Sequence, residues 1–256
     1  MTQFKGRTAL ITGASRGIGR AIALELAQQD MKRLLLVARD RTKLTELAQE
    51  IEALNVEVVI LSLDLTQPIA VHTSLAKAWR NYGPIDLLVN CAGIAHQTPF
   101  LKSKFPQLHE EISLNLMGTY TITHLVAKRM AVRKEGTIVN VSSLMGKVAA
   151  PTMSTYSATK FAILGFTKAL RSELATHQIK VVALLPSLTD TDMARGLKLF
   201  RWVKPMTPQR VAKALITGLR RDSSEILVGW QSYLAVWCQF FAPWLMEKVV
   251  LLAAPL

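Results

Sequence analysis

Short apolar runs and longer amphipathic stretches alternate along most of the chain. The apolar runs, rich in Leu, Val and Ile and bounded by glycine, proline or polar residues, are typical of buried strands. Between them, apolar residues recur three or four positions apart, which is the helical period. The pattern predicts strands at 8–11, 33–38, 56–61, 85–89, 136–141, 179–185 and 225–228. It predicts helices at 20–29, 41–54, 68–81, 155–176, within 105–132, and from 208 onward.

Strand and helix alternate from Arg7 to Pro186 without a linker, a repeat or a low-complexity segment. This order predicts an α/β fold with one doubly wound parallel sheet of about seven strands. Residues 1–228 would form a single domain, and 229–256 an apolar helical tail that is not an independent domain. In such sheets, ligands bind beyond the carboxyl ends of the strands.

A glycine-rich segment, Thr-Gly-Ala-Ser-Arg-Gly-Ile-Gly, joins the first strand to the first helix. Gly13, Gly17 and Gly19 allow a tight turn and a close approach of the backbone to a ligand. The helix that follows would direct its free N–H groups at a phosphate. A plain turn is the alternative, but three glycines between strand and helix favour nucleotide binding.

The residues after the second strand bear on the choice of cofactor. NAD-binding strands usually end near an acid, whereas Ala38 is followed here by Arg39. A cation there suits the 2′-phosphate of NADP, and Arg16 could reach the same group. Both arginines could instead be solvated, and Asp40 could bind a ribose. The sequence therefore favours NADP(H) over NAD.

Tyr156 and Lys160 lie four positions apart in a predicted helix, so they project from the same face. A free phenol has a pKa near ~10, and an adjacent ammonium lowers this pKa by favouring the phenolate. A phenol tuned in this way can protonate a developing alkoxide or accept a proton from an alcohol. The bare pair could also be a helix surface contact, so its interpretation depends on the other motifs.

Composition indicates the size of the core and the cellular compartment. Half of the 256 residues are hydrophobic, which is enough for a large core. Cys91 and Cys238 form no disulfide framework and suggest a reducing compartment, and the five histidines lack metal-ligand spacing. No secretory signal precedes the first strand. We therefore expect a cytoplasmic protein without a metal site.

The net charge of +13 indicates an anionic partner such as a nucleotide phosphate, a membrane or an acidic carrier. No nucleic-acid motif is recognised, so we expect no nucleic-acid partner. Residues 194–221 contain eight lysines and arginines and no acid, with apolar residues interleaved among the first four. This segment is either a solvated basic face or a lid over an apolar substrate near an anionic surface.

The segment from Gly229 to Met246 carries no charge. Its large apolar residues share one helical stripe, and Pro243 should break or kink the helix. The alternatives are a core or oligomer-packing helix, a helix at a membrane surface or lining a lipid pocket, and a true membrane span. The stripe consists of Trp230, Leu234, Trp237, Phe241 and Trp244.

Together these motifs resemble those of the short-chain dehydrogenase/reductase family over about residues 5 to 228. The segment 12–19 matches the family's cofactor turn, and Asp64 matches its adenine-contacting acid. Residues 90–93, Asn-Cys-Ala-Gly, resemble its Asn-Asn-Ala-Gly motif. Residues 186–191 resemble its nicotinamide-binding segment, with serine in place of the common glycine. Four residues fall where its catalytic tetrad lies: Asn115, Ser143, Tyr156 and Lys160.

The resemblance implies a Rossmann-like fold and a role for each tetrad residue. Ser143, preferred to Ser142 by its spacing from Tyr156, would hydrogen-bond the substrate oxygen, and Tyr156 would pass it the proton. Lys160 would lower the pKa of the phenol and hold the nicotinamide ribose, while Asn115 would keep a water near Lys160. The expected cofactor-binding residues are Gly13, Ser15, Arg16, Gly17, Ile18, Gly19, Arg39, Asp64, Leu65, Asn90, Ala92, Gly93, Tyr156, Lys160, Pro186, Thr189 and Thr191.

We therefore expect an NADP(H)-dependent oxidoreductase that interconverts a hydrophobic or lipid-like ketone or aldehyde and its alcohol. The alternatives are a reductase of 3-oxoacyl thioesters on an acidic carrier, and a catalytically silent nucleotide-binding scaffold that docks to a membrane or partner. The resemblance also implies a homodimer or homotetramer packed through the helices of Asn115 and Tyr156. Peripheral membrane contact through the tail is a further expectation.

Overall fold

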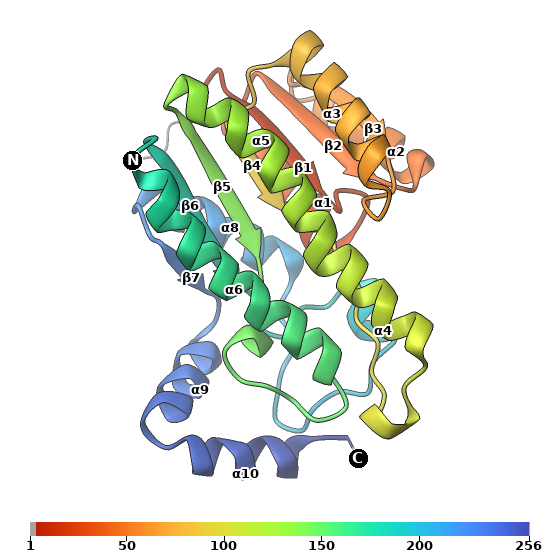
Figure 1. Ribbon diagram of the computed structural model, residues 1–256, viewed down its shortest axis with the longest axis vertical. Coiled ribbons are helices and arrows are strands. Elements are labelled where there is room, and N and C mark those ends of the chain that lie inside the picture. Colours follow the sequence, from red (N-terminus) through yellow and green to blue (C-terminus); the bar gives the residue numbers. More distant parts are fainter. Residues whose placement is uncertain (1–3, 256) are drawn as a thin grey trace.

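Residues 4–255 are described by a computed structural model. Seven parallel strands form one sheet in the order β3-β2-β1-β4-β5-β6-β7 (Figure 1). Each predicted strand is present, with bounds that agree within two residues. The strands are β1 (Thr8–Thr12), β2 (Arg33–Ala38), β3 (Glu57–Ser62), β4 (Leu87–Asn90), β5 (Gly136–Val141), β6 (Ile179–Leu185) and β7 (Glu225–Leu227). The predicted Rossmann-like, doubly wound sheet is confirmed.

Helices cover both faces of the sheet. Successive residues of a strand point to opposite faces, so Leu34 and Leu36 pack with α1, α2 and α8, while Leu35 and Val37 pack with α3 and α5. All four side chains are fully buried, which explains why the strands are continuous apolar runs. The helices are α1 (Gly17–Ala27), α2 (Arg41–Glu52), α3 (Pro68–Tyr82), α5 (Thr119–Arg133), α6 (Ser154–Ala175) and α8 (Pro208–Arg220).

The helix predicted within 105–132 is not one uninterrupted α-helix. The chain forms α4 (Phe105–Glu111), a π-helical segment η2 (Ile112–Gly118) and then α5. Such π-helical segments are commonly found at functional sites, and Asn115 lies in this one. Three short elements in the loops were not predicted: η1 (Phe100–Lys102), η3 (Leu144–Gly146) and α7 (Asp192–Arg195).

The strand order reverses between β1 and β4, which opens a crevice at their carboxyl ends. The Thr12 hydroxyl accepts hydrogen bonds from the backbone amides of Cys91 and Ala92, at 3.0 and 3.1 Å, and so ties the two strand ends together. A Cβ added to Gly19 would lie only 2.3 Å from the carbonyl oxygen of Gly13. The close approach of α1 to the turn therefore requires glycine at position 19.

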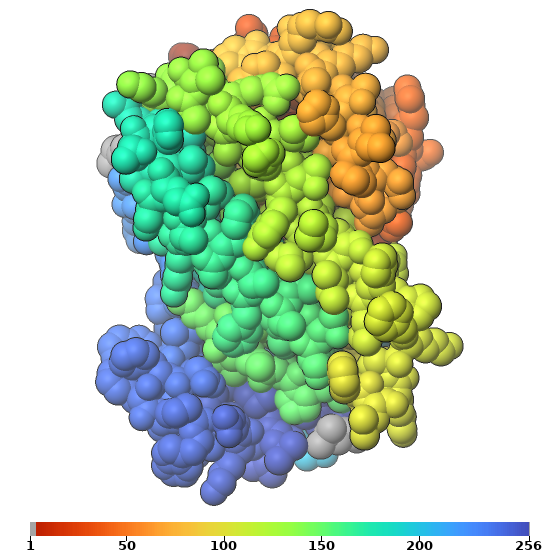
Figure 2. Space-filling model, viewed as in Figure 1, coloured from red at the N-terminus to blue at the C-terminus, as the bar shows by residue number. Residues whose placement is uncertain are grey.

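The tail forms two helices, α9 (Trp230–Phe241) and α10 (Pro243–Ala253), and the break falls at Pro243 as predicted. Both lie beyond the carboxyl ends of the strands, at one end of the molecule (Figures 1 and 2). Within residues 4–255, none of the helices combines the length and apolar character that crossing a membrane demands.

Candidate active site

A cavity of about 880 Å³ lies at the carboxyl ends of the strands. Its wall continues from the glycine-rich turn to the inner sides of α9 and α10. Asn90 and Asn115 do not line it, whereas all the other predicted site residues do. Those that line it are Gly13, Ser15, Arg16, Gly17, Ile18, Gly19, Arg39, Asp64, Leu65, Ala92, Gly93, Ser143, Tyr156, Lys160, Pro186, Thr189 and Thr191.

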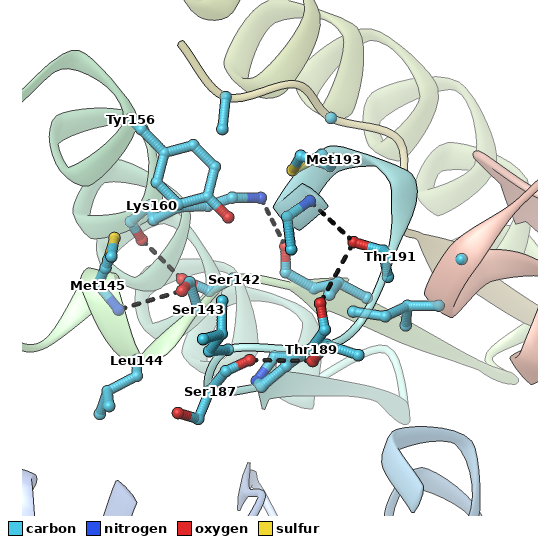
Figure 3. Close-up of a pocket in the computed structure, with 18 of the residues that line it drawn as sticks. Ser142, Ser143, Leu144, Met145, Tyr156, Lys160, Ser187, Thr189, Thr191 and Met193 are labelled. Carbon is cyan, nitrogen blue, oxygen red and sulfur yellow. Dashed lines mark hydrogen bonds between the residues drawn. The ribbon is translucent and has the colours of Figure 1, made fainter. Parts of the chain in front are cut away.

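Tyr156, Lys160 and Ser143 meet in this cavity (Figure 3). Tyr156 and Lys160 are one turn apart near the start of α6, and the Lys160 Nζ lies 5.5 Å from the centre of the phenol ring. Ser143 directly follows β5, and its hydroxyl oxygen accepts a hydrogen bond from the Met145 amide at 3.1 Å. The neighbouring Ser142 is buried and donates to the Lys160 carbonyl at 2.8 Å, which supports the choice of Ser143.

Burial dominates the electrostatics of the pair. Desolvation raises the pKa of the Tyr156 phenol to about 12, and hydrogen bonding with Ser143 only partly opposes this. Desolvation also lowers the pKa of Lys160 to about 8. The expected lowering of the phenol pKa is therefore not found in the protein alone, because burial penalises the phenolate. A neutral phenol beside a charged ammonium is nevertheless the state that can donate a proton to a carbonyl oxygen.

Asn115 acts on the cavity through the backbone after β4. Its Oδ1 accepts from the Ile94 amide and its Nδ2 donates to the Ile94 carbonyl, both at 2.9 Å. A Cβ added to Gly93 would lie 3.1 Å from Asn115 Oδ1 and 3.6 Å from Lys160 Nζ. Asn115 thus holds the loop that passes Lys160, and the water that it would keep there stays a prediction.

The glycine-rich turn is suited to an anionic ligand. The first turn of α1 has no acidic residue, and Arg16 at its N-cap makes no side-chain capping bond. The free N–H groups of this helix start and its dipole favour a phosphate. Gly13 and Gly17 have φ of +67° and +57°, which an L side chain rarely adopts. The residues present therefore fit a dinucleotide.

The cations after β2 fit a second phosphate. Asp40 caps α2, because its side chain accepts from the Lys43 amide at 3.1 Å. Arg39 lines the cavity and makes no ion pair within residues 4–255. Arg16 forms an ion pair instead, with its Nη1 3.9 Å from Asp192 Oδ2. Lys43, in the first turn of α2, also lines the cavity and was missed, although it lies only four positions after Arg39.

Asp64, Thr189 and Thr191 are held by local hydrogen bonds, and Asn90 by bonds to distant segments. Asp64 Oδ1 accepts from both the amide and the hydroxyl of Thr66 at 2.9 Å. Thr191 caps α7, and Thr189 donates to the Ser187 carbonyl at 2.9 Å. Asn90 is buried at the end of β4, and its amide donates at 2.8 Å to two buried acceptors, Thr123 Oγ1 and Asn140 Oδ1.

Glu111 is a buried acid near the site that sequence reasoning missed. Its Oε1 accepts from the His96 amide at 2.6 Å, whereas its Oε2 is buried without a hydrogen-bond partner in the described chain. Burial raises the pKa of this carboxyl. The sequence indicates it only through its position, one helical turn before Asn115.

Comparison with known proteins agrees with this geometry. A family model described as short chain dehydrogenase matches residues 7–201. A 3-oxoacyl-[acyl-carrier-protein] reductase of Synechocystis sp. is 36% identical over 77% of this chain and 80% of its own length. A short-chain dehydrogenase from Sphingobium yanoikuyae, solved in complex with NADPH, is 30% identical with a TM-score of 0.82, covering 96% of this chain and 95% of that one. A bulky-bulky ketone specific alcohol dehydrogenase from Comamonas testosteroni is also 30% identical. It covers 86% of this chain and 85% of its own, with a TM-score of 0.77.

Proposed function

Since this chain belongs to the short-chain dehydrogenase/reductase family and is an NAD(P)-dependent oxidoreductase, we propose that it uses NADP(H) to interconvert a hydrophobic, lipid-like ketone or aldehyde and its alcohol. The shape and lining of the cavity carry the proposal. Beyond Tyr156 the cavity continues between the loop after α7 and the tail helices, where its lining is mostly apolar. These walls include Leu197, Phe200, Leu234, Val249 and Val250.

Bound NADPH supplies the hydride, and the side chains of this chain supply position, charge and a proton. Ser143 donates a hydrogen bond to the substrate oxygen, and Tyr156 transfers its phenolic proton to the developing alkoxide. Lys160, with its pKa near 8, is largely protonated at pH 7 and stabilises the phenolate that remains. Fixed donors of this kind stabilise the charge of the transition state.

The proposed cofactor contacts follow from the cavity walls. The N-terminus of α1 would hold the pyrophosphate, and Arg39 with Lys43 the 2′-phosphate. Asp64 and Leu65 would border the adenine, and residues 186–191 the nicotinamide. Lys160 would also hold the nicotinamide ribose.

The test of the reaction is a panel of carbonyl compounds assayed by NADPH oxidation. Bulky apolar ketones and aldehydes should give a higher kcat/KM than short ones such as acetone, because only they fill the apolar part of the cavity. Absence of oxidation with every compound, despite tight nucleotide binding, would contradict the proposal and favour a silent scaffold.

A reductase of 3-oxoacyl thioesters is the second candidate. Its support is the relative from Synechocystis sp. together with exposed cations on the loop after α7. These cations make no ion pair among residues 4–255 and could steer an acidic carrier. The same panel separates the candidates, since a clear preference for carrier-bound thioesters over free ketones would favour the second.

The proposed assembly and place of action complete this function. A homodimer or homotetramer would pack through η2, α5 and α6, where Ile112, Met117 and Phe161 are exposed. The proposed place of action is the cytoplasm, with the tail providing peripheral contact to a membrane.

Replacing Arg39 with aspartate is expected to lower the affinity for NADPH at least tenfold, while the affinity for NADH changes less. A charge-assisted hydrogen bond to a phosphate contributes about 1.5–3 kcal/mol, and about 1.4 kcal/mol is tenfold in affinity. The new carboxylate would also repel the 2′-phosphate. Fluorescence titration with each nucleotide measures the effect.

Arg41→Asp is the matched control, because Arg41 is an exposed neighbour that does not line the cavity. This variant should bind both nucleotides like the wild type. Equal losses of NADPH and NADH affinity in Arg39→Asp would show that Arg39 does not discriminate between them.

A further inference from the structure

Large exposed apolar side chains gather on the tail. Half of those exposed in residues 4–255 belong to α9 and α10. Trp237 and Phe241 stack with ring centres 5.2 Å apart, yet they are 61% and 67% exposed. A continuous apolar patch of this kind usually marks a contact surface. We define the aromatic face as Tyr233, Trp237, Phe240, Phe241, Trp244 and Leu245, with Trp230 and Leu234 at its edge.

The loop 196–206 lies directly against these two helices. The Arg201 amide donates to the carbonyl of Ala253 at 2.9 Å, and Gln231 Nε2 donates to the carbonyl of Trp202 at 3.4 Å. Trp202 is 69% exposed and adds a further indole beside the aromatic face. The loop and the tail therefore present one combined surface.

This combined surface is apolar and carries a net positive charge, because Glu247 of α10 is the one acid in the loop and the tail helices. Lys198, Arg201 and Lys204 of the loop are exposed and make no ion pair within the described chain. Residues 229–246 carry no charge, and Lys248 of α10 lies 5.6 Å from the ring centre of Trp244. The water–lipid boundary favours tryptophan side chains, and each nearby lysine or arginine adds attraction to anionic lipid.

An adjoining side of the tail faces the cavity. Gln231, Ala235 and Cys238 of α9 line it, as do Val249 and Val250 of α10. Trp230 and Leu234 also line the cavity although they are 69% and 62% exposed, so the apolar part of the cavity adjoins the aromatic face. A surface seated in lipid would place the bilayer next to the apolar part of the cavity.

We propose that the aromatic face and the loop 196–206 bind an anionic lipid bilayer, and that the substrate passes from the bilayer into the cavity beside α9 and α10. A second copy of the chain is a poorer occupant. A two-fold symmetric contact brings equivalent surfaces together, so the unpaired cations of both loops would repel each other. The route of the substrate rests on the proposed reaction, whereas bilayer binding does not.

Co-sedimentation with vesicles tests the bilayer contact. The full chain should bind vesicles of phosphatidylcholine with phosphatidylglycerol more tightly than phosphatidylcholine alone, and high salt should weaken this binding. Lys198→Gln with Lys204→Gln should reduce the partition coefficient roughly 30-fold, at about fivefold per lysine. Replacing Trp237, Phe240 and Trp244 together with glutamine should reduce it at least tenfold.

Matched variants control for charge and hydrophobicity. Lys32→Gln with Lys77→Gln removes two exposed lysines elsewhere, and Ile69→Gln with Val132→Gln removes two side chains that are 83% and 86% exposed. Both should bind vesicles like the wild type. Failure of the full chain to bind, or equal binding to neutral and anionic vesicles, would overturn the proposal. Dissociation of an oligomer by the aromatic variant, without a loss of vesicle binding, would instead show an interface between copies.

A kinetic comparison tests the route of the substrate. The aromatic variant should retain the wild-type kcat/KM for an apolar ketone dissolved in buffer, because none of its three changed residues lines the cavity. For the same ketone presented in anionic vesicles, its kcat/KM should fall at least tenfold below that of the wild type. Equal values in vesicles would overturn this route, while the sedimentation result would still decide bilayer binding.

Discussion

Replacing Tyr156 with phenylalanine is expected to lower kcat by about 10²–10⁴, the usual contribution of a positioned general acid. The substitution removes the phenolic proton and leaves the ring that packs beside Lys160. Because the phenol lies at the cavity wall beside Ser143, no large rearrangement should accompany its loss. NADPH oxidation under substrate saturation measures kcat, and fluorescence titration should show nearly unchanged nucleotide binding.

Tyr120→Phe is the matched control for this experiment. Tyr120 lies on α5, its ring centre is 4.2 Å from that of Phe166, and it does not line the cavity. Its kcat should equal that of the wild type. Retention of full activity by Tyr156→Phe would assign the proton transfer to another group. A cellular role that survives the loss of activity would favour the scaffold alternative.

Replacing Lys160 with methionine is expected to lower kcat about 10²–10³-fold and yet stabilise the protein without cofactor. Activity falls because the cation that stabilises the phenolate is lost. Stability rises because burial lowers the pKa of Lys160 from 10.5 to about 8. At ~1.36 kcal/mol per pKa unit this difference costs the folded state roughly 3 kcal/mol at pH 7. Lys160 Nζ also donates to the Val141 carbonyl at 3.1 Å, and losing this hydrogen bond reduces the gain in stability by about 1 kcal/mol.

The change of unfolding free energy with pH tests whether the buried charge of Lys160 is the cause. Between pH 8 and 10.5 the unfolded chain binds more protons at Lys160 than the folded chain, so wild-type stability rises with pH across this window. The advantage of Lys160→Met should therefore be greatest below pH 8 and shrink toward pH 10.5. Urea unfolding of both proteins at pH 7 and pH 10 measures it, and an advantage that stays constant would contradict the assigned cause.

Most of the residues predicted for the site line one cavity, because their motifs depend on local chemistry. A phenol and an ammonium four apart on a helix share a face whatever surrounds them, and Tyr156 and Lys160 do so here. Glycine is required where the backbone turns with positive φ, as at Gly13 and Gly17. The amide of Asn90 could not be placed this way, because its two acceptors belong to α5 and β5.

By itself the sequence determined the alternation of strands and helices, since the periods of apolar residues are local properties. Only the tertiary structure decided which environment each group meets. Burial among distant segments raises the pKa of Tyr156 instead of lowering it, and leaves one oxygen of Glu111 without a partner. The folded chain also turns one side of α9 toward the cavity and leaves the aromatic side exposed. These outcomes depend on contacts between residues far apart in sequence, which no local pattern specifies.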